Sequence, residues 1–322
     1  MQKLLVLRIM VDLSIIIVSW NCWEYIDQCL QSLEHSESKC SYTVVVVDND
    51  SDDGTPLRVK ERYPYVDVIT NDQNVGFATA NNQALRVVRS RYILLLNPDT
   101  VVRKGALDAL IQFMDDRENI WAAGPAMVNA DGTPQRTGVR FPTNWNILVE
   151  ALFLDRLYPQ LRLFGRHKEL FEDPERPRAV DYVQGACLMV RFKAIETIGG
   201  LDEHFFMYFE ETDWCYRIKA AGGEVYYCPS ATVVHFGGGE TGHYDEVRLL
   251  HYHRSLLLFY HKHYSTLRSV GMRTVLAFRA VLRTVVWSVV AATKPAMRRS
   301  AVSSARGYIK TLGMLLQPVK LP

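Results

Sequence analysis

Short apolar runs alternate with longer amphipathic segments through the first half of the chain, and this alternation limits the fold most. Continuous runs rich in valine and isoleucine predict strands buried on both faces, and apolar residues three or four positions apart predict helices. The expected strands are Leu13–Ser19, Tyr42–Val47, Asp67–Thr70, Tyr92–Leu96 and Ile120–Ala123, and the expected helices are Cys22–Leu33, Phe77–Val88 and Ala106–Met114. This order predicts an α/β fold, with a mostly parallel sheet between two layers of helices.

The pattern loosens between Asn129 and Val180, where glycine, proline and arginine are frequent. A stretch of this length inside a compact domain is more often a functional flap than a linker. Beyond it we expect strands at Gly185–Val190, Glu224–Tyr227 and Thr232–His235, and helices at Phe192–Ile198 and over EETDWCYRIKAAGG. All of the chain after Asp245 is compatible with helices.

Charge is distributed unevenly along the 322 residues. The formal net charge is +2, but residues 247–322 hold 13 Lys and Arg and no Asp or Glu. The other 246 residues hold 24 basic and 35 acidic residues. With 48% hydrophobic residues the chain is not a disordered one. An acidic body followed by a basic region predicts two tasks, and the basic region favours an anionic surface.

The cysteines and the N-terminal segment predict a cytoplasmic protein. The six cysteines form no C-x-x-C pair and have no metal-finger spacing, so reduced structural thiols are expected. Arg8 and Asp12 interrupt the first apolar stretch, and no small-residue cleavage site follows it. A secretory signal peptide is therefore not expected.

Carboxylates follow two of the expected strands. In an open α/β sheet, ligands collect at the carboxyl ends of parallel strands. Asp48 ends the run VVVVD, and Asp99 comes just after ILLLN. Each has a local alternative, because Asp48 could begin an Asx-type turn and Asp99 could cap the helix near Gly105. Two acids at adjacent strand ends favour a polar ligand site.

The chain lacks the usual glycine-rich phosphate-binding loops. No G-x-G-x-x-G follows the first strand, and G-x-x-x-x-G-K-[ST] is absent. A phosphorylated ligand would then need a divalent cation held by carboxylates and an imidazole. Asp99 is one candidate ligand, and His235 is another because it ends a strand just before Gly237, Gly238 and Gly239, where the chain can bend sharply. A hydrogen-bonded structural role is the alternative for His235.

A second acidic cluster lies in the segment FFMYFEETDWCYR. Glu210, Glu211 and Asp213 stand near the start of an expected helix, where acids interact favourably with the helix dipole. The dipole does not explain the aromatic residues between Phe205 and Phe209. Apolar neighbours desolvate a carboxylate and raise its pKa, as a general acid or base requires.

Several segments follow one another in a characteristic order: SIIIVSWN, VVVVDNDSDDGT, NVGFATANN, LLLNPDT, GACLMV, IGGLDEHFFMYFEETDWCYR and VVHFGGG. In these segments, over roughly Leu13 to Tyr264, the chain resembles family 2 glycosyltransferases. Within that family it is most similar to bacterial rhamnosyltransferase-like enzymes of cell-surface polysaccharide assembly. The resemblance implies a GT-A fold, an inverting mechanism, a nucleotide-sugar donor and a divalent metal, usually Mg²⁺ or Mn²⁺.

The resemblance also implies roles for particular residues. Asp48 would bind the pyrimidine base of the donor. Asp99 would contact the metal as the last acid of the family's D-x-D motif, in which Asn97 replaces the first acid, and His235 would complete the metal shell. Glu211 matches the expected catalytic base, with Asp213 as its rival because glutamate stands where aspartate is usual. The resemblance further implies donor-binding positions at Val18, Trp20, Asn74 and Asn81 and acceptor-side positions at Gly185, Ala186 and Glu210.

The basic C-terminal region is expected to form helices of its own. We expect a catalytic domain over residues 1–245, with a donor half of about 1–125 and an acceptor half of about 126–245, and a helical region over 246–322. On a helix, one face of the apolar segment Val270–Thr293 and its flanks carries Arg268, Arg273, Arg279, Arg283 and Lys294, and the opposite face carries Phe278, Val281, Leu282, Val285 and Val289. Internal arginines argue against a spanning helix and favour one lying in a membrane interface. A helix packed on the catalytic domain with its arginines in water, or a pair of helices forming an oligomer interface, stays open.

These patterns bear on three candidate functions. A glycosyltransferase at the inner face of the membrane would use a dTDP-sugar such as dTDP-rhamnose, or a UDP-sugar, and a polyprenyl-linked or polysaccharide acceptor. A sugar nucleotidyltransferase would need a loop rich in glycine and arginine after the first strand, where SWNCWEY has neither. A non-catalytic sugar-binding protein would be expected to lose the acids that this chain keeps. We therefore expect the glycosyltransferase, without a nucleic-acid partner.

Overall fold

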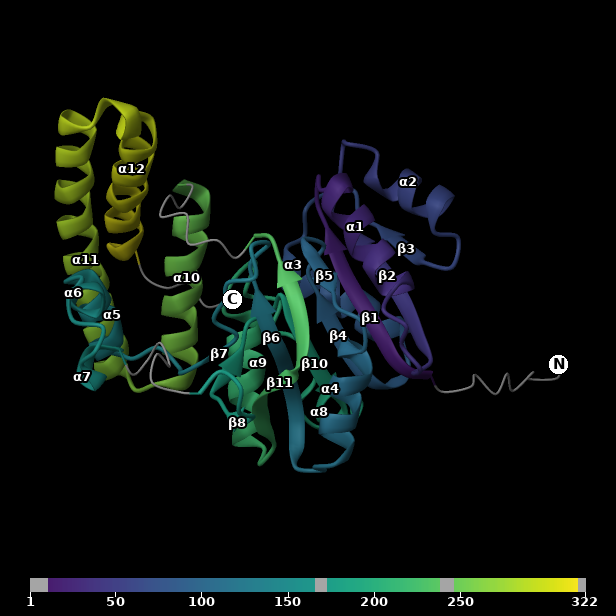
Figure 1. Ribbon diagram of the computed structural model, residues 1–322. Helices are drawn as coiled ribbons and strands as arrows, with labels where there is room; N and C mark the ends of the chain where they lie inside the picture. The colour runs from purple at the N-terminus through teal and green to yellow at the C-terminus, as the bar shows by residue number, and fades with distance from the viewer. Residues whose placement is uncertain (1–10, 166–172, 238–245, 318–322) are drawn as a thin grey trace.

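The computed structural model describes residues 11–165, 173–237 and 246–317. Its centre is a nine-stranded mixed sheet in the order β3-β2-β1-β4-β10-β6-β11-β5, with β8 paired to β11 (Figure 1). The strands of this sheet are β1 (Val11–Ser19), β2 (Tyr42–Asp48), β3 (Asp67–Thr70), β4 (Ser90–Leu96), β5 (Thr100–Val102), β6 (Ile120–Val128), β8 (Arg178–Ala179), β10 (Cys187–Arg191) and β11 (Glu224–His235). Two short strands, β7 (Gly138–Val139) and β9 (Tyr182–Val183), pair separately.

Helices cover both faces of the sheet because side chains along the buried strands alternate between two apolar layers. The helices before the C-terminal region are α1 (Trp23–Glu34), α2 (Thr55–Arg62), α3 (Phe77–Val87), α4 (Ala106–Asp115), α5 (Asn144–Ala151), α6 (Leu154–Leu157), α7 (Arg162–Gly165), α8 (Phe192–Ile198) and α9 (Glu210–Ala220). On β1, Ile15 and Ile17 pack in the layer that contains α1 and α4. Ile16 between them packs in the layer that contains α3, α8 and α9. The predicted α/β fold with helices on both faces is confirmed.

Strand direction brings several predicted ligand positions to one edge of the sheet. β3, β2, β1 and β4 are parallel, and β6 is parallel to β11. β10 runs antiparallel to both of its neighbours, β4 and β6. The carboxyl ends of β2, β4 and β11 therefore lie at the same edge as the beginning of β10.

The sequence does not predict α2, α5, α6, α7 or the short strands β7, β8 and β9, and two further differences concern strands beside the site. The segments Glu224–Tyr227 and Thr232–His235, expected as separate strands, belong to the single strand β11, whose pairing with β6 is irregular between Cys228 and Thr232. β5 was not predicted, and it pairs antiparallel with the end of β11. Both errors have one cause: pairing with distant segments overrides the local turn signal of Cys228-Pro229-Ser230 and orders a strand of only three residues.

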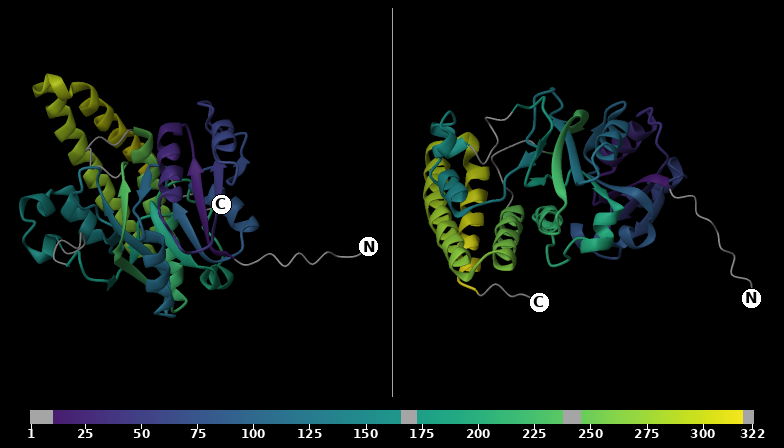
Figure 2. Two further views of the ribbon diagram at one scale, coloured as in Figure 1. Left: turned by 45° about the vertical axis from the view of Figure 1, so that its right-hand side comes forward. Right: turned by 90° about the horizontal axis from the view of Figure 1, so that it is seen from below.

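The C-terminal helices form a layer beside the sheet. They are α10 (Glu246–His263), α11 (Thr266–Thr293) and α12 (Arg298–Leu315), with a short 3₁₀ turn, η2 (Pro295–Met297), between the last two. α11 and α12 form a hairpin, and α10 lies between this hairpin and the sheet (Figures 1 and 2). An apolar cluster joins α10 to Phe205 and Phe209, just before α9. The expected domain boundary at residue 245 stays a prediction, because residues 238–245 lie outside the described residues, and with them the predicted bend at Gly238 and Gly239. The N-terminal segment 1–10 lies outside them as well.

α11 turns its internal arginines inward and its apolar face outward. The Arg279 side chain is only 11% exposed and lies 3.6 Å from a carboxylate oxygen of Glu150 in α5. Arg283 donates a hydrogen bond to the main-chain oxygen of Glu150. By contrast, Phe278 is 46% and Val281 52% exposed. Arg279 and Arg283 are therefore not in water, so this part of the packed-helix alternative is wrong. The packing that the same alternative expected is present, because Met272 and Leu276 of α11 join the apolar cluster of Phe205 and Phe209.

Candidate functional site

Polar groups from three strand ends meet at the common edge of the sheet. Asn97 directly follows β4, and its main-chain N–H donates to the oxygen of Ala186, just before β10, at 2.9 Å. His235 at the end of β11 pairs with Thr100 of β5, which brings the imidazole next to Asp99. The side chains of Asn97, Asp99 and His235 line one large cleft.

Asp99 and His235 face each other closely without a hydrogen bond between them. The Asp99 Oδ1 to His235 Nε2 distance is 3.4 Å. Asp99 Oδ1 is buried and has no hydrogen-bond partner among the described residues. The helix-cap alternative for Asp99 is wrong, because α4 has Gly105 at its N-cap and no side chain caps it. Helix capping therefore does not account for the position of the Asp99 carboxylate.

Gln135, which sequence reasoning missed, fixes the imidazole of His235. The Gln135 amide nitrogen donates to the main-chain oxygen of His235 at 2.6 Å and to Asn129 Oδ1 at 2.7 Å. The Gln135 oxygen must therefore accept from His235 Nδ1, 3.0 Å away. The proton then resides on Nδ1, which leaves the Nε2 lone pair directed toward Asp99. Asp99 and His235 together present two acceptor atoms to one small space.

Gly237 allows this approach. A Cβ atom at Gly237 would lie 1.9 Å from Asp99 Oδ2, far inside van der Waals contact. Any side chain at this position would displace the Asp99 carboxylate. Gly237, two residues after His235, therefore makes room for the Asp99 carboxylate, and it also belongs to the glycine run at which the sequence predicts a bend.

Glu210, which is buried, and Glu211, which is half-buried, form a pair of carboxyl groups at the start of α9. Both side chains line the cleft, and one oxygen of each is buried without a hydrogen-bond partner among the described residues. The preceding residues Tyr208 and Phe209 both have left-handed backbone conformations, with φ of 67° and 69°. Such conformations are costly for bulky residues and concentrate at functional sites. The strained turn sets the direction in which α9 begins and therefore the position of the two carboxyl groups in its first turn.

The surroundings of these acids favour their neutral forms. Burial raises the pKa of Glu211 to about 7. Burial and the nearby Glu211 carboxylate raise the pKa of Glu210 well above its usual range. Gly185 lies directly beside Glu211, since a Cβ there would be 3.5 Å from the Glu211 side chain. A carboxyl group with a pKa near neutrality can exchange a proton with a ligand in the cleft.

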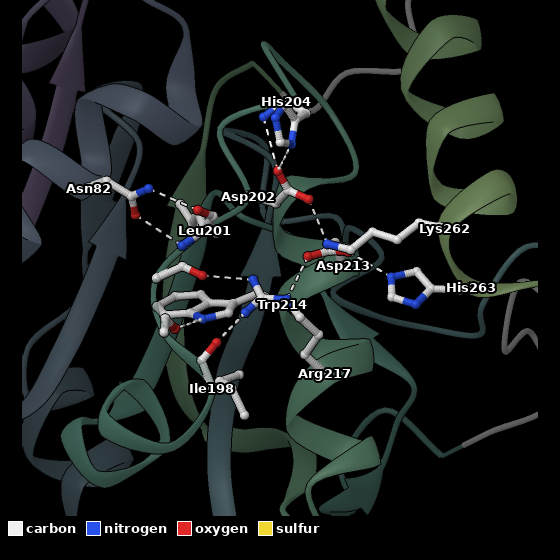
Figure 3. Close-up of polar contacts among 12 residues, drawn as sticks. Asn82, Ile198, Leu201, Asp202, His204, Asp213, Trp214, Arg217, Lys262 and His263 are labelled. Carbon is white, nitrogen blue, oxygen red and sulfur yellow. Dashed lines mark hydrogen bonds and ion pairs between the residues drawn. The ribbon is translucent and has the colours of Figure 1, made fainter. Parts of the chain in front are cut away.

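Asp213 lies in a different environment, although it is only two residues further on. Its side chain is fully buried and forms ion pairs with Arg217 at 2.7 Å, Lys262 at 2.7 Å and His263 at 2.6 Å (Figure 3). Burial alone would raise the pKa of Asp213, but these three partners outweigh it and lower the pKa to about 2. Asp213 thus ties α9 to the end of α10, away from the residues that line the cleft.

We predict that Asp213→Asn destabilises the protein by about 3–5 kcal/mol, because it removes the charge of a buried carboxylate that pairs with Arg217, Lys262 and His263. The depressed pKa means that this stabilisation is present above about pH 4, the pKa of the unfolded state, and is lost as the pH falls toward about 2. Urea unfolding at pH 7 and pH 3 tests both points. Asp131→Asn, on an exposed turn, serves as the control and should unfold like the wild type. Equal stability of the Asp213 variant and the wild type at pH 7 would contradict this role.

Asp48 is buried at the end of β2 and holds the following loop. Its carboxylate accepts hydrogen bonds from the Ser19 hydroxyl at 2.8 Å, the Ser51 hydroxyl at 2.7 Å and the Ser51 N–H at 2.9 Å. The Asx-type turn that the sequence offered as an alternative is therefore present. Contact between Asp48 and the base of a donor stays a prediction.

The cleft of about 2070 Å³ contains only part of the predicted site. Its lining includes Asn97, Asp99, Gly185, Ala186, Glu210, Glu211 and His235. Among the described residues, the predicted positions outside this lining are Val18, Trp20, Asp48, Asn74, Asn81 and Asp213. Of these, Trp20 is 56% exposed beyond the end of β1, and Asn81 is buried in α3 with its amide oxygen unpartnered. Asn74 accepts a hydrogen bond from the N–H of Gly76.

The comparison with known families decides the identity of the fold. The family model described as glycosyl transferase family 2 matches residues 14–199, more than half of the chain. The chain belongs to this family. The matched region contains the strand ends that carry Asp48 and Asp99, and it stops before the acidic cluster at the start of α9.

Relatives of this family 2 glycosyltransferase extend the likeness beyond the matched region. An N-acetylglucosaminyl-diphospho-decaprenol L-rhamnosyltransferase of Mycobacterium tuberculosis is 29% identical over 293 residues, covering 84% of this chain and 94% of that protein. The rhamnosyltransferase WbbL of Escherichia coli is 26% identical over 230 residues, covering 69% of this chain and 82% of that protein. These relatives confirm the predicted likeness to rhamnosyltransferases.

Solved structures confirm the GT-A fold. The mannosyltransferase PcManGT from Pyrobaculum calidifontis, in complex with GDP-Man and Mn²⁺, superposes with a TM-score of 0.56 at 16% identity, over 95% of this chain and 84% of that one. GalNAc-T7 with UDP, GalNAc and Mn²⁺ superposes with a TM-score of 0.57 at 16% identity, over 77% of this chain and 48% of that one. The present chain thus spans about half the length of GalNAc-T7.

Proposed function

We propose that this family 2 glycosyltransferase is an inverting, metal-dependent enzyme of cell-surface glycan assembly. It would transfer a sugar, with rhamnose as the first candidate, from a nucleoside diphosphate to an acceptor linked to a lipid through diphosphate. The observation that carries the proposal is that one cleft contains both the Asp99–His235 pair and the half-buried acid Glu211. The rhamnosyltransferases of M. tuberculosis and E. coli support the choice of sugar, and the M. tuberculosis protein supports the acceptor.

Asp99 and His235 fit a divalent cation. The unpartnered Asp99 Oδ1 and the Nε2 lone pair of His235 are the two donor atoms that converge. Among the described residues, no group of three or more His, Cys, Asp and Glu side chains could hold a metal ion. Two protein ligands suit Mg²⁺ or Mn²⁺ in this setting, since such ions usually complete their shell with water and substrate phosphates. When bound, the cation supplies charge neutralisation to the diphosphate leaving group.

Glu211 is suited to take the proton from the attacking hydroxyl group of the acceptor. A sugar that leaves a diphosphate develops oxocarbenium character, and the acceptor oxygen attacks the opposite face of the ring. This oxygen must lose its proton as the new bond forms, and the unpartnered oxygen of Glu211 can accept it. A single displacement of this kind inverts the anomeric configuration. Asp48, Val18, Trp20, Asn74, Asn81 and Asn97 remain proposed donor contacts, and Gly185, Ala186 and Glu210 remain proposed acceptor contacts.

A donor screen tests the proposed substrate. Purified full-length protein is incubated with an N-acetylglucosaminyl-diphospho-polyprenol acceptor and with dTDP-rhamnose, UDP-glucose, UDP-galactose or GDP-mannose, each with Mg²⁺ or Mn²⁺. We expect acceptor-dependent release of nucleoside diphosphate to be fastest with dTDP-rhamnose. Faster release with a UDP-sugar would replace rhamnose in the proposal, and no release with any donor would contradict glycosyl transfer.

We further propose that the outward apolar face of α11 contacts the inner surface of the cytoplasmic membrane. α11 is the one helix in the described ranges that is long and apolar enough to cross a membrane, by length and composition alone. Its internal residues Arg279 and Arg283 face α5, which favours a helix lying on the membrane surface. The exposed apolar side chains are Leu267, Val270, Phe278, Val281, Val285 and Val289. Exposed cations of α12, such as Arg298 and Arg299, would add attraction to anionic lipids.

The double variant Phe278→Glu with Val285→Glu should lower binding to vesicles of phosphatidylglycerol and phosphatidylcholine at least tenfold, since two apolar side chains no longer insert. Sedimentation of full-length protein with vesicles measures this, and added salt should weaken the remaining electrostatic part. Val87→Glu, at an exposed apolar position in α3, is the control. Unchanged vesicle binding together with loss of a dimer would instead assign the face to an oligomer interface.

A further inference from the structure

Three arginines of the C-terminal helices form one wall of the same cleft that contains Glu211. Arg248 of α10 and Arg279 and Arg283 of α11 all line it, and we call these three residues the arginine wall. Two acids, Glu150 and Asp155, also line this part of the cleft, as does a fourth arginine, Arg156. Cationic groups therefore exceed carboxylates at this end.

Neighbouring groups hold two members of the arginine wall, Arg279 and Arg283, in place. The guanidinium of Arg283 lies 3.6 Å from the ring centre of Phe153 and donates to the main-chain oxygen of Glu150 at 2.8 Å. Its Nε is buried without a hydrogen-bond partner among the described residues. Burial lowers the pKa of Arg283 to about 10, so the group is still charged at neutral pH. Arg279 lies beside the Glu150 carboxylate, and Arg248 is exposed.

Tyr252 connects the arginine wall to the Glu211 end of the cleft. It lines the cleft and lies four residues after Arg248 on α10. Its ring centre is 6.1 Å from that of Tyr208 and 5.4 Å from that of Phe209, the two residues directly before Glu210 and Glu211. The arginine wall therefore lies on the Glu211 side of the cleft, where an acceptor would enter.

We propose that the arginine wall binds the diphosphate group that joins the acceptor sugar to its lipid. This inference rests on the proposed function, since it names the part of the acceptor that the cleft recognises. Guanidinium groups bind phosphate oxygens through paired, charge-assisted hydrogen bonds, which suits a doubly phosphorylated linker better than a neutral glycan. α11 also carries the exposed apolar face on its other side, so the same helix would meet both the charged linker and the membrane that holds the lipid.

Binding of farnesyl diphosphate to the full-length protein tests the arginine wall without any transfer reaction. Titration calorimetry compares farnesyl diphosphate, inorganic diphosphate and farnesol with the wild type and the variants Arg248→Gln and Arg279→Gln. Arg306→Gln, at an exposed arginine of α12 that does not line this cleft, matches the loss of charge. Arg248→Gln changes an exposed side chain, so it keeps the test valid if Arg279→Gln does not fold.

We expect farnesyl diphosphate to bind the wild type more tightly than inorganic diphosphate does, and farnesol to bind weakest. The Kd of farnesyl diphosphate should rise about tenfold or more in Arg248→Gln and Arg279→Gln and stay constant in Arg306→Gln. The Kd of dTDP should not change. Unchanged affinity for farnesyl diphosphate in both cleft variants would overturn the inference, and so would an equal loss of dTDP affinity. Intact, arginine-dependent binding in a protein that transfers no sugar would overturn the proposed function alone.

Discussion

Glu211→Gln should lower kcat by a factor of at least about a hundred, the usual contribution of a general base. The amide keeps the shape of the side chain but cannot accept the proton of the acceptor hydroxyl group. Donor affinity should stay within about twofold of the wild type, because the nucleotide is expected at the other strand ends. Steady-state kinetics combined with calorimetry of the donor separate the two effects. In the wild type, the rate should rise as the pH increases through about 7, where Glu211 loses its proton.

Asp213→Asn is the informative comparison, because this residue is the rival for the role of base. Its ion pairs with Arg217, Lys262 and His263 predict a loss of stability, with activity per folded molecule retained at a temperature where the variant is folded. A fully active Glu211→Gln enzyme beside a folded but inactive Asp213→Asn enzyme would assign the base to Asp213. Such a result would contradict a purely structural role for the Asp213 ion pairs drawn in Figure 3.

Asp99→Ala should abolish metal-dependent turnover, a loss of three orders of magnitude or more on the scale of several kcal/mol that a Lewis acid supplies. It removes one of the two donor atoms that converge beside His235. Excess chelator should reduce the wild type to the same level. Electron paramagnetic resonance of Mn²⁺ should show weaker binding to Asp99→Ala than to the wild type in the presence of dTDP.

Asp116→Ala is the matched control for Asp99→Ala. Asp116 is an exposed carboxylate that lines the same cleft at the end of α4, so its removal changes the charge of the cleft but not the Asp99–His235 pair. Its turnover and Mn²⁺ affinity should equal those of the wild type. Full activity of either the wild type in excess chelator or Asp99→Ala would contradict the metal assignment.

The edge of the sheet could be predicted because its components are local. The runs that form β2 and β4 are continuous and apolar, and each ends at a polar residue, so the strand ends that carry Asp48 and Asp99 follow from the pattern. The position of His235 next to Asp99 also needed β5, a strand of three residues that no local signal marks. Sequence patterns therefore placed Asp99 and His235 at strand ends but did not predict the contact between them.

The supporting groups could not be predicted because they come from irregular or distant segments. Gln135 lies in the stretch from Asn129 to Val180, where no periodicity places a side chain. The environments of Glu211 and Asp213 differ largely through Lys262 and His263, about 50 residues further along the chain, in addition to Arg217 one helical turn away. Nothing in a local pattern distinguishes two acids two positions apart on one helical turn.

The C-terminal helix shows a similar limit. Helical periodicity correctly divided α11 into a basic and an apolar face, but it could not determine which face is buried. Packing against Glu150 and Phe153 turns the arginines toward the cleft. The sequence predicts residues 246–322 as a separate basic region. The observed orientation of α11 instead brings its arginines to the proposed acceptor side of the cleft.

The structure of the reaction product tests the central claim most directly. Full-length protein, dTDP-rhamnose, Mn²⁺ and an N-acetylglucosaminyl-diphospho-lipid acceptor are combined, and the product is examined by mass spectrometry and by the one-bond C–H coupling at the new anomeric carbon. The account predicts one sugar transferred for each dTDP released, with the anomeric configuration opposite to that of the donor. A product with the donor's configuration, or dTDP release without a glycosylated acceptor, would contradict it.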